Sequence, residues 1–256
     1  MKKIFAILMV LIMAAATLAL AGCGGDSNGG GESGSNRETL TMATNADFPP
    51  FEFINDAGEY DGFDVHLARA IADYLDMDLV INNMAFEAVL VAVETGQADV
   101  AIAAITITPE RAEAVNFTVP YFETTLVAIV MEDSDITSLD QLTEANIAVQ
   151  LGTTSDVFVE DELPDANVTR LSSPPTTVLE LTTGRADAIV IDLEVANQFI
   201  NDHPGLRILD DPLGMESYGM AVNRDNAELL DDINRALESL KASGEYDRIW
   251  DMFFGG

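Results

Sequence analysis

Cationic and thiol side chains are the scarcest groups in this sequence of 256 residues. Twelve lysines and arginines stand against 44 aspartates and glutamates, which gives a formal net charge of −32 at pH 7. Nucleic-acid binding needs a basic surface, so this composition excludes that class. The only cysteine is Cys23, which excludes an internal disulfide. With His66 and His203 as the only histidines, we expect no metal centre and no cofactor.

The acidic excess affects the salt concentration at which the chain can fold. Self-repulsion at this charge destabilises a compact state unless salt screens it, and the Debye length falls to about 3 Å at about 1 M salt. One interpretation is a protein that works outside the cell in high salt. The other is an ordinary acidic exported protein, and the composition leaves both open. A hydrophobic content of 48% supports substantial cores and argues against global disorder.

The N-terminal segment has the pattern of an export signal. Two lysines at positions 2 and 3 precede an apolar run that ends at Ala21-Gly22-Cys23. This order is typical of a signal peptide, with a short transmembrane helix as the alternative. The small residues before the cysteine resemble the lipobox of bacterial lipoproteins. That resemblance implies a signal peptide over residues 1–22 and a lipid on Cys23. It places the protein on the outer face of the cell membrane, or on its periplasmic side. Residues 24–36, nearly all Gly, Ser, Asn and acid, predict a flexible tether.

Apolar periodicity after the tether predicts alternating strands and helices. The expected strands include residues 40–43, 79–81 and 188–191, and the expected helices cover residues 63–75, 86–95, 178–183 and 193–200. Strands that alternate with helices of this length favour a parallel or mixed sheet covered by helices. The sequence therefore predicts an α/β protein.

A weak internal repeat suggests two similar lobes. Residues 96–102, GQADVAI, resemble residues 184–190, GRADAIV, at an offset of 88 (184 minus 96), and each copy follows a predicted helix. Helix–Gly–strand units also look alike by chance, so the repeat alone does not establish that the chain has two similar lobes. The same offset carries Ala104 onto Asp192, each just past the end of its strand. Ligands of open α/β sheets bind beyond the carboxyl ends of strands. Asp192 is therefore a candidate for a ligand contact, or else for a helix cap.

The stretch TITPER, residues 106–111, predicts a helix start with an unusual residue in it. Thr108 can cap the helix, and Pro109 suits its first position. A capping box would then have Glu or Gln where Arg111 stands. A cation in the first turn costs roughly a few tenths of a kcal/mol against the helix dipole. This cost points to a functional role for Arg111, with an ordinary surface residue as the alternative.

Six segments together carry a family resemblance. They are ATNADFPPFEF, GFDVHLARAIADYL, GQADVAIAAITITPERAEAVNFTVPYF, IAVQLGTTSD, GRADAIVIDL and GEYDRIWDMFFG. In this order, and over residues 38–254, they resemble the bacterial extracellular solute-binding proteins of family 3. These proteins serve polar amino-acid ABC importers, and the glutamine-binding proteins are among them. The TITPER–NFTVPYF block is the most specific part of the match.

The resemblance implies the type II periplasmic-binding-protein fold. This fold has two α/β lobes, each with a mixed sheet, joined by two crossing hinge strands. We place the hinges at residues 121–125 and 214–218. Lobe 1 would then be residues 37–120 plus 219–256, and lobe 2 would be residues 126–213.

The resemblance also assigns roles to individual residues. Arg111 would hold the ligand α-carboxylate through two parallel bonds, a geometry that suits a guanidinium. Asp192 would take the ligand ammonium, and the backbone carbonyl of Ala104 could share it. The family more often has glycine at that position, so Ala104 crowds the backbone. The hydroxyl of Thr106 would add a bond from lobe 1, and Thr154 would add one from lobe 2.

The side chain of the ligand would meet a different set of residues. Phe48 and Phe86 would sandwich its aliphatic stem, with ordinary core packing as the alternative for each. Asn45 and Gln150 are neutral amides at positions where other family members carry charge, and they favour a glutamine-like ligand. The nearby acids Asp47 and Glu87 could instead recruit arginine or lysine.

The expected partners are a free L-amino acid, an ABC permease and, through Cys23, the membrane, with the protein itself a monomer. Hinge closure would capture the ligand without changing any bond in it, so we expect no enzymatic activity. A cyclohexadienyl dehydratase, which shares the fold, would need a general acid such as Glu52 or Glu87. A receptor ectodomain would require a membrane span and a signalling domain after Gly256.

Overall fold

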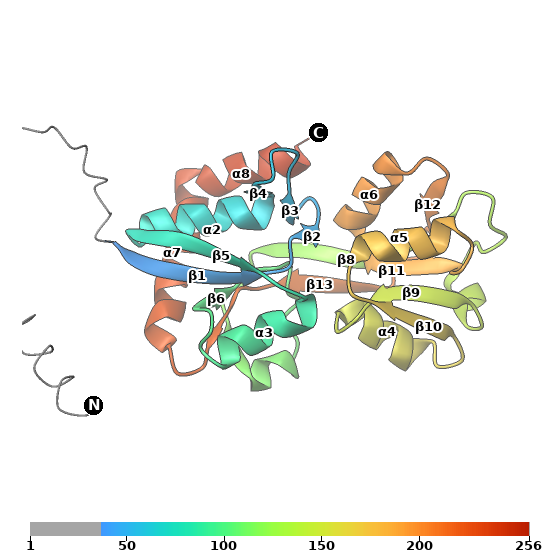
Figure 1. Ribbon diagram of the computed structural model, residues 1–256, viewed down its shortest axis with the longest axis horizontal. Coiled ribbons are helices and arrows are strands. Elements are labelled where there is room, and N and C mark those ends of the chain that lie inside the picture. The colour runs from blue at the N-terminus through green and yellow to red at the C-terminus, as the bar shows by residue number, and fades with distance from the viewer. Residues whose placement is uncertain (1–36, 256) are drawn as a thin grey trace, which may run out of the picture. The chain divides into compact units, whose positions relative to one another are not determined.

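The computed structural model describes residues 37–255 (Figure 1). The predicted signal peptide, the lipid site Cys23 and the tether lie outside these described residues. No helix within residues 37–255 is long and apolar enough to cross a membrane.

The first sheet mixes parallel and antiparallel strands. Its spatial order is β5 (Met77–Asn83), β1 (Glu38–Thr44), β6 (Val100–Ala101), β14 (Ala221–Asn223) and β7 (Val115–Phe117). β1 pairs in parallel with both β5 and β6, whereas β14 is antiparallel to β6 and β7. The helices that pack in this lobe are α2 (Phe63–Tyr74), α3 (Phe86–Glu94), α7 (Ala227–Ser243) and α8 (Glu245–Phe254).

The second sheet has the same mixed character. Its order is β10 (Asn167–Leu171), β9 (Asn146–Gln150), β11 (Ala188–Asp192), β8 (Phe122–Met131) and β12 (Leu206–Ile208), with β13 (Gly214–Tyr218) also paired to β8. The helices α4 (Thr154–Glu162), α5 (Pro174–Thr182) and α6 (Leu193–Asp202) pack against it. The expected fold class, two α/β lobes with a mixed sheet each, is confirmed.

The strands β8 and β13 run between the two sheets (Figure 1). They pair antiparallel over five residues, from Phe122 opposite Tyr218 to Leu126 opposite Gly214. The aromatic rings of Phe51, Phe122 and Tyr218 meet where this ribbon enters lobe 1, with centroids 4.9 Å apart for Phe51–Phe122 and 5.3 Å for Phe51–Tyr218. Edge-to-face pairs of this kind contribute about 0.5–1.5 kcal/mol each beyond their burial. These rings therefore fix the base of the ribbon in lobe 1.

The internal repeat of the sequence is a repeat of structure. The N–H of Asp99 donates to Thr41, and the carboxylate of Asp99 accepts the N–H of Thr41 at 2.7 Å. Asp187 makes the same reciprocal pair with Asn146, at 2.8 Å. Gly96 and Gly184, which end the preceding helices, both have left-handed backbone, with φ of 73° and 70°. Chance similarity does not produce matching hydrogen bonds, so the two lobes share one helix–turn–strand unit.

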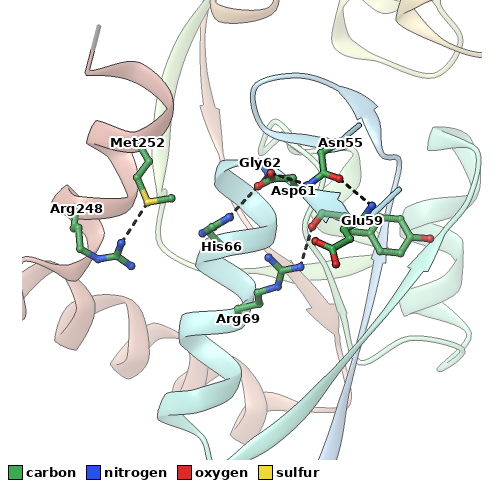
Figure 2. A network of polar contacts seen from close by, with 9 residues as sticks. Asn55, Glu59, Asp61, Gly62, His66, Arg69, Arg248 and Met252 are labelled. Atoms are coloured by element: carbon green, nitrogen blue, oxygen red, sulfur yellow. Dashed lines mark hydrogen bonds and ion pairs between the residues drawn. The ribbon is translucent and has the colours of Figure 1, made fainter. Parts of the chain in front are cut away.

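A small antiparallel sheet leads into α2. It consists of β2 (Asp47–Phe48), β3 (Glu52–Ile54) and β4 (Tyr60–Asp61). His66 on α2 points back to Asp61, with Nε2 2.9 Å from Oδ1 (Figure 2). Burial acts to raise the pKa of Asp61, but bonds from Gly62, Asn55 and His66 outweigh it and lower that pKa. His66 thus holds the turn before α2.

The prediction that TITPER starts an α-helix is wrong, because the chain forms only a short 3₁₀ turn there. The hydroxyl of Thr108 does accept the N–H of Arg111, at 3.2 Å, as a cap would. However, only a 3₁₀ turn, η1 (Arg111–Glu113), follows, and the chain then enters β7. So short a turn has almost no macrodipole, because the dipole sums over many aligned peptides. The position of Arg111 therefore carries little dipole cost.

Candidate ligand-binding site

The nine residues predicted to contact a ligand line one cavity. They are Asn45, Phe48, Phe86, Ala104, Thr106, Arg111, Gln150, Thr154 and Asp192. The empty space around the lining atoms, open solvent at its mouth included, is about 310 Å³. The residues come from both lobes, at the ends of β1, β9 and β11 and from the loop after β6. The carboxyl ends of parallel strands thus meet at this cavity, as expected for open α/β sheets.

Arg111 spans the two lobes through its guanidinium group. Nη1 donates to the carbonyl of Thr106 at 2.8 Å, and Nη2 donates to the carbonyl of Gly152 at 3.2 Å. The guanidinium carbon lies 5.6 Å from the centre of the Phe86 ring, which is cation–π range. Burial lowers the pKa of Arg111 while Glu216 and Asp192 act to raise it. An arginine stays charged under such shifts, so the cavity contains a fixed cation.

Asp192 supplies the opposite charge from lobe 2. It ends β11 and is 7% exposed. The hydroxyl of Tyr218 donates to Oδ1 at 2.5 Å, and the side chain makes no capping bond to α6. Of the two interpretations of Asp192, the helix-cap one is therefore not supported. Burial first, and then the neighbouring charge of Glu216, raise the pKa of Asp192 well above its ordinary value.

Thr106 lines the same cavity as these two charged groups. Its hydroxyl donates to Glu216 Oε2 at 2.6 Å and lies 3.5 Å from the hydroxyl of Thr154. Thr154 is the first residue of α4, which Thr153 caps by accepting the N–H of Asp156. The two threonines thus face each other across the cavity from opposite lobes.

The two amides predicted to select the ligand bond to each other. Gln150 Nε2 donates to Asn45 Oδ1 at 2.9 Å and to the Ser172 carbonyl at 3.3 Å. Asn45 Nδ2 donates to the Met84 carbonyl at 2.9 Å. Backbone carbonyls can only accept, so these bonds fix the orientation of both amides. Three of their four N–H donors, both of Gln150 and one of Asn45, are thus committed to protein atoms.

Ala104 has a strained backbone beside the cavity. Its φ is 46°, in the left-handed region that alanine disfavours by roughly 1–2 kcal/mol. The carboxylate of Asp64 accepts the Ala104 N–H at 2.8 Å, which helps to hold this conformation. The glycine that is frequent here in the family would adopt it without a Cβ penalty.

We expect Ala104→Gly to raise the free energy of unfolding by up to about 1 kcal/mol, because relief of the left-handed strain exceeds the entropy that glycine adds to the unfolded chain. Ala103→Gly is the matched control at a buried neighbour with no positive φ. It should lower that free energy by about 0.5–1 kcal/mol. Urea denaturation measures both. Equal losses in the two variants would contradict the strain at Ala104.

Further residues belong to the cavity although the sequence did not mark them as ligand contacts. Glu52, Ala103 and Thr153 line it, and Glu216 bonds Thr106 beside it. Glu52 entered the prediction only as an alternative general acid. Glu216 lies inside the predicted second hinge, a position that signals a site residue only once the lobes are folded together. Within residues 37–255, no group of three or more His, Cys, Asp or Glu side chains is placed to hold a metal ion.

Comparison with known sequences decides the family. The profile described as "Bacterial extracellular solute-binding proteins, family 3" matches residues 40–256, which is most of the chain. The chain belongs to this family. Its members bind free amino acids outside the cytoplasm and work with ABC permeases. A cavity lined by both a cation and a carboxylate is consistent with the binding of such ligands.

Similar members of family 3 differ in the ligands that their names give. The chain is 33% identical over 222 residues to a putative ABC transporter arginine-binding protein 2 of Escherichia coli K12, covering 85% of this chain and 91% of that protein. It is 31% identical over 249 residues to a probable histidine-binding protein of Neisseria gonorrhoeae, covering 94% and 93%. Among solved structures, an ancestral arginine-binding protein bound to glutamine has a TM-score of 0.82 and 39% identity, covering 86% of this chain and 99% of that one.

Proposed function

We propose that this protein is the substrate-binding component of an ABC importer and captures an L-amino acid without altering it. One observation carries the proposal: a guanidinium and a carboxylate, Arg111 and Asp192, line one cavity from opposite lobes. A zwitterion offers the complementary pair of charges. Charge-assisted hydrogen bonds in a closed, low-dielectric site are among the strongest that a protein makes.

Capture would proceed from lobe 1 to lobe 2. The α-carboxylate docks on Arg111 and the hydroxyl of Thr106, with Phe48 and Phe86 on either side of the ligand stem. Bending of the β8–β13 ribbon then brings Thr154 and Asp192 onto the ligand. The same closure would present both lobes to the permease. A lipid on Cys23 would keep the protein at the membrane.

The directions of the hydrogen bonds favour a ligand side chain rich in donors. Both N–H donors of Gln150 and one of the two N–H donors of Asn45 are already used on protein acceptors, so these two residues offer the ligand mainly oxygen atoms. A guanidinium carries five N–H donors and no acceptor. We therefore propose arginine as the ligand, although the types of these residues alone favoured glutamine.

Glutamine remains the second candidate on one specific observation. A 39% identical arginine-binding relative has been solved with glutamine bound. The amide of glutamine also brings two donors, but its carbonyl oxygen would need a donor from the protein. Among these amides, one Asn45 N–H is not bonded to a described residue, and the other three N–H groups would have to leave their present partners to provide one.

A dehydratase activity is the less supported alternative. Of the two candidate general acids, Glu52 lines the cavity and Glu87 does not, and Glu52 lies within hydrogen-bonding reach of Asp64 on α2. A general acid has to reach the leaving group of its substrate. Turnover of prephenate or arogenate by the purified protein would overturn the transport assignment.

Calorimetric titration of the protein, freed of bound ligand, tests the proposal. We expect L-arginine to bind most tightly and L-glutamine about 5- to 150-fold more weakly, since an unpaired buried carbonyl costs about 1–3 kcal/mol. D-Arginine is the matched control, because it places the same groups with inverted geometry. Tighter binding of glutamine would reverse the ligand assignment. A folded protein that binds no amino acid would refute the function.

A further inference from the structure

Two buried carboxyl groups beside the cavity have an unexplained feature in common. Glu52 on β3 is 1% exposed, and Asp64 on α2 is completely buried. Their side chains lie within hydrogen-bonding reach of each other. One oxygen of each, Glu52 Oε2 and Asp64 Oδ1, has no hydrogen-bond partner among the described residues. A buried polar atom without a partner is rare in proteins and calls for a physical explanation.

The other oxygen of Asp64 shows which of the two groups is ionised. Asp64 Oδ2 accepts the N–H of Ala104 and the hydroxyl of Tyr121, each at 2.8 Å. A carboxylate that accepts two donors is stabilised in its charged form. A proton between the two groups therefore belongs on Glu52. That proton gives the pair a hydrogen bond where two carboxylates would only repel each other.

We propose that Glu52 is protonated at neutral pH and donates a hydrogen bond to the Asp64 carboxylate. This bond fixes the left-handed Ala104 backbone and the start of β8 for ligand binding. Glu52 is then a positioning residue. Its effect passes through Asp64 to Ala104, which lines the cavity, and to Tyr121, which precedes β8. The inference goes beyond the proposed function, and only its affinity test rests on that function.

The surroundings of the pair oppose a second negative charge. Tyr121 donates to Asp64, and Tyr246 is close enough to interact with it electrostatically. Asp192 acts on Glu52 from lobe 2, and Glu216 and Arg111 act on or with Asp192; in this set Arg111 is the one cation. Burial first, and then Asp64 and Asp192, raise the pKa of Glu52 well above its ordinary value. Burial raises the pKa of Asp64 to about 6, against the lowering bonds from Ala104, Tyr121 and Glu52. The raised pKa of Glu52, and the bonds that act to lower the pKa of Asp64, both favour a proton on Glu52.

Infrared spectroscopy of ligand-free protein labelled with ¹³C at the glutamate carboxyl groups tests the proton directly. At about pH 7 an ordinary glutamate is ionised, so we expect one glutamic-acid C=O absorption, and Glu52→Gln should remove it. The aspartates do not contribute to this signal. An absent absorption in the wild type, or one that persists in Glu52→Gln, would overturn the proposal.

Thermal unfolding as a function of pH gives a second, ligand-free test. A raised folded-state pKa means that the protonated group stabilises the fold at low pH and that this stability is lost as the pH rises through that pKa. The wild-type unfolding constant should rise by up to about tenfold per pH unit relative to that of Glu52→Gln, whose amide cannot lose the proton. Glu87→Gln, at an exposed acid, should follow the wild type. Parallel curves for wild type and Glu52→Gln would contradict the shared proton.

Affinity for L-arginine and L-glutamine then tests the positioning role. At about pH 7, Glu52→Gln should bind within about threefold of the wild type, because the amide donates as the protonated acid does. At alkaline pH the wild type should lose up to about tenfold in affinity per pH unit, whereas Glu52→Gln should not. Equal alkaline losses would refute the role. If neither amino acid binds, the proposed function fails, while the infrared and unfolding tests still decide the proton.

Discussion

Arg111→Ala is expected to lower the affinity for the amino acid by a factor of roughly 30 to several thousand, because removing one partner of a buried, hydrogen-bonded charge pair costs about 2–5 kcal/mol. The loss has two sources. The ligand α-carboxylate would be buried without its cation, and the link from the guanidinium to the Gly152 carbonyl of lobe 2 would disappear. Calorimetric titration with L-arginine and L-glutamine at constant salt measures the effect.

Two controls separate recognition of the carboxylate from general damage. Arg111→Lys keeps the charge but cannot form two parallel bonds, so it should recover only part of the lost affinity. Arg185→Ala removes an exposed arginine that pairs with Glu180 in lobe 2, and it should bind as the wild type does. An Arg111→Ala protein that folds and retains wild-type affinity would show that the carboxylate is held elsewhere.

Much of the fold could be read from periodic patterns in the sequence. The predicted helix over residues 63–75 is α2, and the helix over residues 86–95 is α3. Both have a strong apolar periodicity over about three turns, which is the most reliable signal that a sequence carries. The boundaries of β5 were less predictable, since it extends to Met77 and Asn83 on either side of residues 79–81. Pairing with β1 along its whole length sets that extent.

The predicted helix at TITPER is only a 3₁₀ turn, and this difference has a physical cause. Thr108 and Pro109 are local signals for a helix start, but they do not determine how far a helix continues. The chain ends the turn after Glu113 because Val115 and Asn116 pair with β14, about 100 residues later in the sequence. A tertiary contact thus overrides a local preference.

The cavity could be predicted as a set of residues but not as a network. Family motifs and the internal repeat led to Arg111 and Asp192. No local pattern could reveal that Gln150 would bond Asn45, because those residues are 105 positions apart and meet only when the lobes do. Glu52 and Asp64 are only 12 positions apart (64 minus 52), but no local pattern shows that β3 and α2 bring their side chains together inside lobe 1. Hydrogen-bond directions, which bear on the choice of ligand, exist only in the folded chain.

Asp192→Asn is expected to weaken amino-acid binding by a factor of roughly 100 or more, because the variant keeps the shape of the side chain but removes the charge that pairs with the ligand ammonium. The variant should also change the pH dependence. Burial first, and then Glu216, raise the pKa of Asp192 in the ligand-free protein. An ammonium needs the ionised form, so binding should release a proton, and wild-type affinity should fall as the pH falls below that pKa. Asp192→Asn should show no such acid limb.

Stability should respond to Asp192 in the opposite direction. Since its folded-state pKa is raised, the protonated form stabilises the ligand-free protein, and this stability is lost as the pH rises through that pKa. Asp192→Asn should therefore gain stability relative to the wild type at neutral and alkaline pH while it loses affinity. Calorimetry in two buffers of different ionisation enthalpy counts the released proton, and thermal unfolding without ligand measures the gain. A variant that lost affinity and stability together, with an unchanged acid limb, would show that Asp192 supports the fold through Tyr218 and does not bind the ammonium.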